Sequence, residues 1–280
     1  MRPGSFFYYS SLEGERKDWI KKLLSERQIY FRSRDQLNDI NELRPKFGLG
    51  GDKKSQIAYV RQQVAKYGTE LSPAQKLLVR GNLLRRLTMK NGNAEKDLYE
   101  ILDRTGILSV SETLDSHTLW GSYADKYRGI AIEFDSSKGL FAHANKVVYQ
   151  EETPWAKMLE DSDETATQKF VLTKLNQWEH EREWRVIARC SDPPRIDKHL
   201  NEYNYADNDV ATFIRASHGS GYYQIPIDSI RAIVLGPQIS KPDQSWLQSL
   251  VKDLRIANLL VNAVRNPNGS ISKAGRVDQA

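Results

Sequence analysis

The sequence predicts an α+β fold, because helical and strand-like patterns occupy separate stretches of the chain. Residues 6–34 read as strand, helix and strand, and residues from about 55 to 104 read as helices. Most later segments are short apolar runs typical of strands. The 280 residues are 39% apolar and 10% aromatic. This is enough for a sizeable core and argues against global disorder.

The first elements follow from periodicity and from turn residues. The apolar run Phe6–Ser11 lies between glycines and predicts a short buried strand. Residues 14–28 carry apolar side chains at helical spacing and predict a helix, and Ile29–Arg34 predicts a second strand. The stretch from Asp35 to about Lys54 is rich in Asn, Asp, Gly and Lys and predicts a loop.

A helical block extends from about Ser55 to Arg104. Its first helix should end at Gly68. Ser72-Pro73 is a favourable pair for the N-cap and first turn of the next helix, and the last helix of the block is expected to close on Gly106.

The second half of the chain alternates short strands with a few helices. A helix at Thr118–Lys126 should stop at Gly129, before the strand Ile130–Phe134. Helices are also expected at residues 163–178 and 241–254. The polar residues 193–209 predict an inserted loop, and residues 266–280 predict a flexible tail. Further strands are expected at residues 106–113, 146–151, 211–216, 221–227 and 230–236.

The stretch Trp178–Arg189, WEHEREWRVIAR, places acidic and basic residues at alternate positions. If a strand begins near Arg182, then Glu183, Arg185 and Ile187 lie on one face. The next apolar residues, Trp184, Val186 and Ala188, then lie on the other face. A carboxylate and a guanidinium side by side at the start of a strand indicate either a surface ion pair or part of a functional site.

Charge and cysteine content narrow the functional classes. A net charge of +5 and a pI near 9.1 are compatible with a polyanionic partner without requiring one. Cys190 is the only cysteine, and the five histidines are far apart, so we expect neither a disulfide framework nor a metal cofactor. No apolar run has transmembrane length and no signal sequence is evident, so we expect a cytoplasmic protein without a membrane partner.

The strongest cationic stretch lies within the helical block. It contains Arg80, Arg85, Arg86 and Lys90. These side chains either follow a phosphate backbone or form an ordinary solvated helix face.

Three motifs in order resemble those of a widespread prokaryotic domain family of unknown function. They are YFRSRDQLND at Tyr30–Asp39, HTLWGSYADKYRGIAIEFD at His117–Asp135 and WEHEREWRVI at Trp178–Ile187. They correspond to the patterns NDxxE, WxxYAxxxxG and WxxExEWR of that family, and Ile230–Ser240 resembles its closing strand. The resemblance extends over residues 6 to 245, nearly the whole chain.

A more distant resemblance concerns mechanism. The order of strand, helix, arginine-bearing strand, helical insertion and late Glu-Trp-Arg strand is similar to that of ADP-ribosyltransferases, especially the DarT-type toxins. The resemblance implies a pair of small packed β-sheets with a helical insertion at about residues 55–105. The whole would be a single domain of residues 1–265, followed by the flexible tail 266–280.

The same resemblance implies roles for particular residues, with NAD as co-substrate. Glu183 would be the catalytic carboxylate, and Glu181 is an alternative or a substrate-side partner. A guanidinium suits the diphosphate, and Arg32 and Arg34 would share one strand face from which either can serve. The nicotinamide ring would need an aromatic wall and a hydroxyl for its carboxamide. The candidates are Tyr9, Tyr123 and Trp120 for the ring, and Ser10 or Ser11 for the carboxamide, although Trp120 is more typical of a core residue.

The expected function is therefore transfer of ADP-ribose from NAD to nucleic acid, either RNA or single-stranded DNA. Such an enzyme would act as a toxin or phage-defence effector, and an antitoxin protein would be its partner. Two alternatives remain open. One is a non-enzymatic module that binds nucleotide or nucleic acid, and the other is an NAD glycohydrolase, which uses water as the acceptor.

Overall fold

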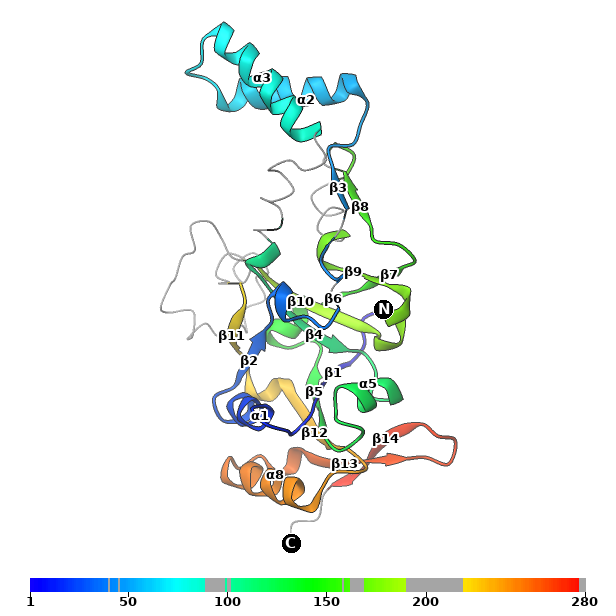
Figure 1. The fold of residues 1–280 in the computed structure, drawn as a ribbon. Coiled ribbons are helices and arrows are strands. Elements are labelled where there is room, and N and C mark those ends of the chain that lie inside the picture. Colours follow the sequence, from blue (N-terminus) through cyan, green and yellow to red (C-terminus); the bar gives the residue numbers. More distant parts are fainter. Residues whose placement is uncertain are drawn as a thin grey trace. The chain divides into compact units, whose positions relative to one another are not determined.

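The computed structural model describes residues 1–39, 41–44, 46–88, 99, 102–157, 159–161, 169–189 and 219–276. Helices and strands are both well represented, in several sheets, which confirms the α+β class (Figure 1). Contacts divide the chain into two compact units, and the expectation that residues 1–265 form a single domain stays a prediction. Unit 1 comprises Met1–Ser33, Thr105–Val147 and Gln177–Ala280, and unit 2 comprises Arg34–Arg104 and Val148–Asn176.

Unit 1 is built on one eight-stranded sheet, where a pair of small packed sheets was expected. The strand order is β14-β13-β12-β5-β1-β4-β10-β6, and its pairs are antiparallel except for β12 with β13. The strands are β1 (Ser5–Ser10), β4 (Thr105–Ser111), β5 (Ile130–Asp135), β6 (Asn145–Lys146), β10 (Glu183–Arg189), β12 (Ile230–Leu235), β13 (Leu260–Arg265) and β14 (Ile271–Arg276). A separate two-stranded sheet pairs β2 (Gln28–Phe31) with β11 (Gly221–Gln224).

The large sheet packs a different apolar cluster on each face. On the face that we call the α8 face, Phe6 and Trp184 pack with residues of α1 (Arg16–Ser25) and α8 (Lys241–Asp253). On the opposite face, the α5 face, Phe7 packs with Trp120 of α5 (His117–Ser122). Strand alternation explains the division, since neighbouring residues of β1 point to opposite faces.

The helix α5 ends at Ser122, earlier than the expected Lys126. The reason lies in the next turn, where Asp125, Lys126 and Tyr127 all adopt positive φ angles of 45° to 68°. A right-handed helix cannot continue through left-handed residues. The chain then reaches Gly129, where a Cβ atom would lie 2.2 Å from the carbonyl oxygen of Ser10. Only glycine allows this approach to β1.

The C-terminal residues form a strand where a flexible tail was expected. Residues Ile271–Arg276 are β14, which pairs with β13. The Ile271 side chain is buried, and its amide donates to the Asp115 carboxylate at 2.7 Å. Lys273 Nζ lies 2.6 Å from the Glu133 carboxylate on β5. These long-range contacts order a segment whose local sequence resembles a loop.

Several other expected boundaries were wrong. The strand expected to reach Arg34 ends at Phe31, and residues Arg34–Gln36 form a 3-10 turn, η1. The helix expected to close on Gly106 does not reach it, because β4 begins at Thr105.

Two more segments have a different secondary structure from the one expected. Residues 146–151 contribute to β6 and to β7 (Val148–Gln150), and the expected helix 163–178 contains β9 (Thr173–Leu175) and the start of the 3-10 helix η3 (Asn176–Glu181). The expected loop 193–209 and strand 211–216 lie outside the described residues.

Unit 2 contains the expected helical insertion. Its main helices are α2 (Lys53–Tyr67) and α3 (Pro73–Thr88). The predicted N-terminus of α3 is confirmed, since the Ser72 hydroxyl accepts from the Gln75 amide while the Gln75 side chain accepts from the Ser72 amide. Two short parallel pairs complete the unit, β3 (Lys46–Gly48) with β8 (Trp155–Lys157) and β7 with β9.

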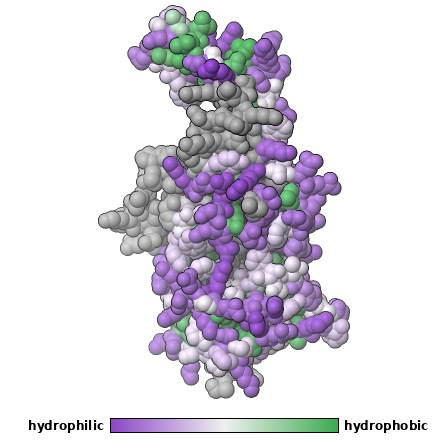
Figure 2. Space-filling view, viewed as in Figure 1, coloured by the Kyte–Doolittle hydropathy of each residue, from purple (hydrophilic) through white to green (hydrophobic). Residues whose placement is uncertain are grey.

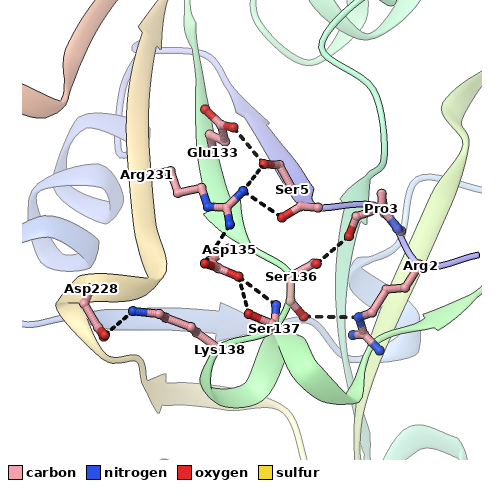
Figure 3. Close-up of polar contacts among 11 residues, drawn as sticks. Arg2, Pro3, Ser5, Glu133, Asp135, Ser136, Ser137, Lys138, Asp228 and Arg231 are labelled. Carbon is pink, nitrogen blue, oxygen red and sulfur yellow. Dashed lines mark hydrogen bonds and ion pairs between the residues drawn. The ribbon is translucent and has the colours of Figure 1, made fainter.

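A polar network holds the N-terminal end of β1 against β5 and β12 (Figure 3). Arg231 of β12 donates to the Gly4 carbonyl, the Ser5 hydroxyl and the Asp135 carboxylate, with donor–acceptor distances of 2.8 to 2.9 Å. The Ser137 hydroxyl also donates to Asp135, at 2.6 Å. Three neighbouring strands are thereby tied together through one guanidinium.

We expect this network to make folding stability depend on acid pH. Hydrogen bonds from the Ser137 side chain and backbone and from Arg231, opposed by desolvation, lower the pKa of Asp135 from 3.8 to about 2. Because the folded pKa is the lower one, the stabilisation is complete above about pH 4 and is lost as pH falls towards 2. Asp135→Asn should reduce the unfolding free energy by about 1 kcal/mol at neutral pH. Urea titrations of both proteins should show this difference shrinking between pH 4 and pH 2.

The matched control is Asp228→Asn. Asp228 forms a more exposed ion pair with Lys138, so its replacement should have a smaller effect. A deficit of Asp135→Asn that stays constant from pH 7 to pH 2 would contradict the assignment of the effect to this carboxylate.

Candidate functional site

The Glu-x-Glu-x-Arg sequence occupies the junction between η3 and β10. Glu181 is the last residue of η3, Arg182 has a φ of 46°, and Glu183 begins β10. The predicted alternation is confirmed. Trp184 and Val186 belong to the apolar cluster of the α8 face. The side chains of Glu183 and Arg185 therefore point to the α5 face.

Glu183 and Arg185 form a buried bidentate ion pair. Arg185 Nε lies 2.8 Å from Glu183 Oε1, and Arg185 Nη2 lies 3.0 Å from Oε2. The two residues are 4% and 0% exposed, so of the two alternatives that the sequence left open, the surface ion pair is excluded. Burial lowers the pKa of the Arg185 guanidinium, but a guanidinium held by a carboxylate stays charged at neutral pH. The pair therefore fixes both the charge and the orientation of the Glu183 carboxylate.

Glu181 is held by two contacts from distant parts of unit 1. The Tyr123 hydroxyl donates to Glu181 Oε1 at 2.7 Å. The Ser111 hydroxyl of β4 donates to the Glu181 carbonyl, also at 2.7 Å. Ser111 is in turn directly opposite Glu183 in the β4–β10 ladder. The WxxYAxxxxG and WxxExEWR motifs thus meet through Tyr123 and Glu181.

Strained backbone lies on both sides of this meeting point. Arg182 separates the two glutamates with a left-handed conformation, and Asp125, Lys126 and Tyr127 follow Tyr123 closely with three more. A left-handed conformation costs a residue with a side chain about 1–2 kcal/mol. Such strain accumulates at functional sites, where surrounding contacts hold it in place. This concentration marks the Tyr123–Glu181 junction as the candidate site.

Tyr9 shares the α5 face with Glu183 but is a packed residue. Its ring makes an edge-to-face contact with Trp120, with centroids 5.2 Å apart, and its hydroxyl donates to the Thr113 carbonyl at 2.8 Å. Burial, with the nearby Asp115 charge, raises the pKa of Tyr9 well above its ordinary value, so the hydroxyl stays protonated. Trp120 is completely buried, which confirms that it is a core residue.

The structure separates Ser10 from these groups. Phe7 and Tyr9 lie on the α5 face, so the next residue of β1 points to the other face. Ser10 is buried there and its hydroxyl donates to the Ser11 carbonyl. Ser10 and Tyr9 therefore do not line the same side of the sheet.

The two candidate arginines do not share a strand face as expected. Arg32 exchanges two backbone hydrogen bonds with Ile107, each 2.8 Å long. Burial lowers the pKa of Arg16, and the charge of Arg32 lowers it further, so the two cations lie within each other's field. Arg34 belongs to unit 2, where it pairs with Asp103 at 2.6 Å and its guanidinium lies 4.7 Å from the centre of the Tyr99 ring.

The cationic stretch of α3 does not form one stripe. Arg80 and Arg85 both lie on α3, and five helical residues separate them by about 140° around its axis. Arg80 is half-buried, whereas Arg85 is exposed and its guanidinium lies 3.5 Å from Asn82 Oδ1. The side chain of Arg86 and the whole of Lys90 lie outside the described residues.

Two serines of β4 lie beside the Glu183–Arg185 pair, and the sequence did not lead us to expect them there. Ser109 and Ser111 lie opposite Arg185 and Glu183, which makes this patch of the α5 face polar across two strands. Glu112 follows and accepts from the Trp184 indole at 2.8 Å. The signal was present in TGILSVS, where Ser109 and Ser111 alternate with the apolar Leu108 and Val110.

Comparisons with known proteins add no further assignment. No family model, curated protein or solved structure matches this chain. In the described part of the chain, no group of three or more His, Cys, Asp or Glu side chains is arranged to hold a metal ion. No described helix is both long and apolar enough to cross a membrane. The resemblances to the prokaryotic domain family and to ADP-ribosyltransferases therefore stay predictions.

Removing the Tyr123 hydroxyl should test the junction directly. Tyr123→Phe removes the hydrogen bond to a buried carboxylate and should lower the unfolding free energy by about 1.5–3 kcal/mol. Tyr67→Phe is the control, because Tyr67 is 72% exposed and its change should stay within about 0.5 kcal/mol. Equal stabilities of wild type and Tyr123→Phe in chemical denaturation would mean that the hydrogen bond contributes nothing to the site.

Proposed function

We propose that the protein transfers ADP-ribose from NAD to nucleic acid, with Glu181 and Glu183 as the reacting carboxylates. The observation that carries the proposal is the pairing of these two acids at the start of β10, where Tyr123 holds Glu181 and Arg185 holds Glu183. The strained turns at Arg182 and after Tyr123 support the same location.

Breaking the bond between nicotinamide and ribose generates positive charge on the sugar. A carboxylate whose ionised form is fixed stabilises that charge. Glu183 is the candidate for this role, because Arg185 Nε and Nη2 contact its two oxygens and hold the carboxylate in one orientation. Nicotinamide leaves as a neutral base and takes the bonding electron pair.

The acceptor must lose a proton as its new bond to the ribose carbon forms. Glu181 is the candidate to receive that proton, since the Tyr123 hydroxyl orients its Oε1 close to Glu183 in the sequence. The two carboxylates would therefore have different roles: Glu183 stabilises the sugar cation, and Glu181 acts as the general base. For the diphosphate, Arg32 is the remaining candidate in unit 1, because Arg34 belongs to unit 2 and pairs with Asp103.

Transfer to RNA or single-stranded DNA would make the protein a toxin or phage-defence effector, neutralised by an antitoxin protein. The test is incubation with adenylate-labelled NAD and separate pools of RNA, single-stranded DNA and cell protein. We expect label in one nucleic-acid pool, lost in Glu181→Gln and in Glu183→Gln. Label in protein alone would overturn the nucleic-acid assignment, and free ADP-ribose without labelled macromolecule would indicate a glycohydrolase.

A second function, a non-enzymatic nucleotide-binding module, is favoured by one observation. Both carboxylates are no more than 5% exposed, and Glu183 already makes two hydrogen bonds to Arg185. Such a module would bind NAD without releasing nicotinamide. Calorimetric binding of NAD that is unchanged in Glu183→Gln, with no nicotinamide released, would support this function over the transferase.

A further inference from the structure

The surface of the α2–α3 hairpin carries an inference that is independent of the proposed function. Four large apolar side chains there are exposed, with Tyr67 at 72%, Leu77 at 70%, Leu78 at 67% and Val79 at 36%. Figure 2 shows apolar surface gathered over these two helices. Tyr67 and Val79 also line the groove between the two helices, whereas Leu77 and Leu78 point elsewhere around α3. Exposed apolar surface that lines a groove marks an interaction site.

The same two helices line an open apolar groove of about 360 Å³. Val64 and Tyr67 line it from α2, Val79 and Leu83 from α3, and Leu71 from the connection between them. Packing between the two helices covers little of α2, whose only buried residues are Val60 and Val64. Two helices leave such a groove between them, and a third helix laid along it completes a bundle-like core.

The charge around the groove specifies the chemistry of that third helix. Residues 52–88 contain eight lysines and arginines and two acids, a net charge of +6, which exceeds the +5 of the whole chain. An acidic partner is therefore favoured, and a second copy of this chain, which carries the same positive charge, is disfavoured. The groove lining contains Tyr, Gln, Val, Gly and Leu but no lysine or arginine.

We propose that the α2–α3 groove binds an acidic amphipathic helix of a partner protein. The partner's apolar side chains would enter the groove against Tyr67, Val79 and Leu83, and its carboxylates would face the cations of the two helices. Nucleic acid fits less well, because a phosphate backbone would leave the apolar lining of the groove in water and because Arg80 and Arg85 do not form one stripe. A lipid surface fits less well because it is flat, whereas the site is a groove.

The test uses the full chain and a fluorescein-labelled helical peptide with leucines at i, i+3, i+4 and i+7 and glutamates elsewhere. Fluorescence anisotropy should show saturable binding that weakens at least tenfold in the double variant Val79→Asp/Leu83→Asp and in Tyr67→Ser, since all three residues line the groove. Val264→Asp, a similar change at an exposed residue of β13, should bind as the wild type does. The peptide with lysine in place of glutamate should not bind.

Three results would overturn the proposal. One is binding of the acidic peptide that is equal in wild type and in both groove variants, when circular dichroism shows all of them folded. Another is binding of a single-stranded oligonucleotide or of phosphatidylglycerol vesicles that is lost in Val79→Asp/Leu83→Asp. The last is self-association in sedimentation velocity that the same variant abolishes, which would make the groove an interface between copies of this chain.

Discussion

Glu183→Ala is expected to lose about 3–5 kcal/mol of unfolding free energy, one of the largest effects of any single substitution in the chain. The reason is the environment of Arg185. This residue is completely buried, and its guanidinium donates hydrogen bonds to both oxygens of the Glu183 carboxylate. Without that carboxylate, a guanidinium stays in the interior and loses a bidentate ion pair. Urea denaturation at neutral pH measures the loss.

The double variant Glu183→Leu/Arg185→Met is the control for this prediction. It removes both charges together, so its stability should return to within about 2 kcal/mol of wild type, although neither single variant does. The thermodynamic cycle gives the coupling energy between the two residues. A loss below about 1 kcal/mol in Glu183→Ala would mean that the buried pair is not formed in solution.

Gly129→Ala is expected to destabilise unit 1 by about 3 kcal/mol or more. The added methyl group would lie 2.2 Å from the Ser10 carbonyl oxygen and 3.0 Å from the backbone of Ala124. Both neighbours are backbone atoms, so relief of the overlap requires β1 or the turn after α5 to move. A thermal or chemical denaturation curve of the variant measures the effect.

Gly121→Ala provides the same chemical change within the same motif. Gly121 lies inside α5 with open space around its Cβ position, so alanine there should be neutral or should stabilise by up to about 1 kcal/mol. If the two variants had equal stability, the close approach of Gly129 to β1 would be contradicted, and the glycine of the WxxYAxxxxG motif would need another explanation.

Sequence patterns correctly predicted features that depend on neighbouring residues, such as strand alternation and helix caps. The period-two alternation of Trp184 and Val186 gave the correct faces of β10, and caps such as Ser72 gave the correct start of α3. Prediction failed where pairing is long-range. Residues Thr173–Leu175 form a strand only because they pair with Val148–Gln150, and Ile271–Arg276 only because they pair with β13. Neither partner is visible from the sequence of the segment itself.

The candidate site was predictable in part. The sequence placed Glu183 at the start of a strand beside Arg185, and the structure confirms that position. It did not indicate that the pair is buried, because burial depends on what packs over the α5 face. Pairing of Tyr123 with Glu181 joins residues 58 positions apart, beyond any local pattern. Tyr9 and Ser10 were both candidates for contacts with nicotinamide, but adjacent strand residues point to opposite faces, so the two cannot line one site on this sheet.

The most direct test of the central claim is nicotinamide release from NAD, measured with the purified chain and the three acceptor pools together. We expect wild type to release nicotinamide and Glu183→Gln to be at least about 100-fold slower. The double variant Glu183→Leu/Arg185→Met should be folded and equally inactive, which separates chemistry from stability. Equal rates in wild type and Glu183→Gln, or no release by folded wild type with any acceptor, would contradict the assignment of a catalytic site to the start of β10.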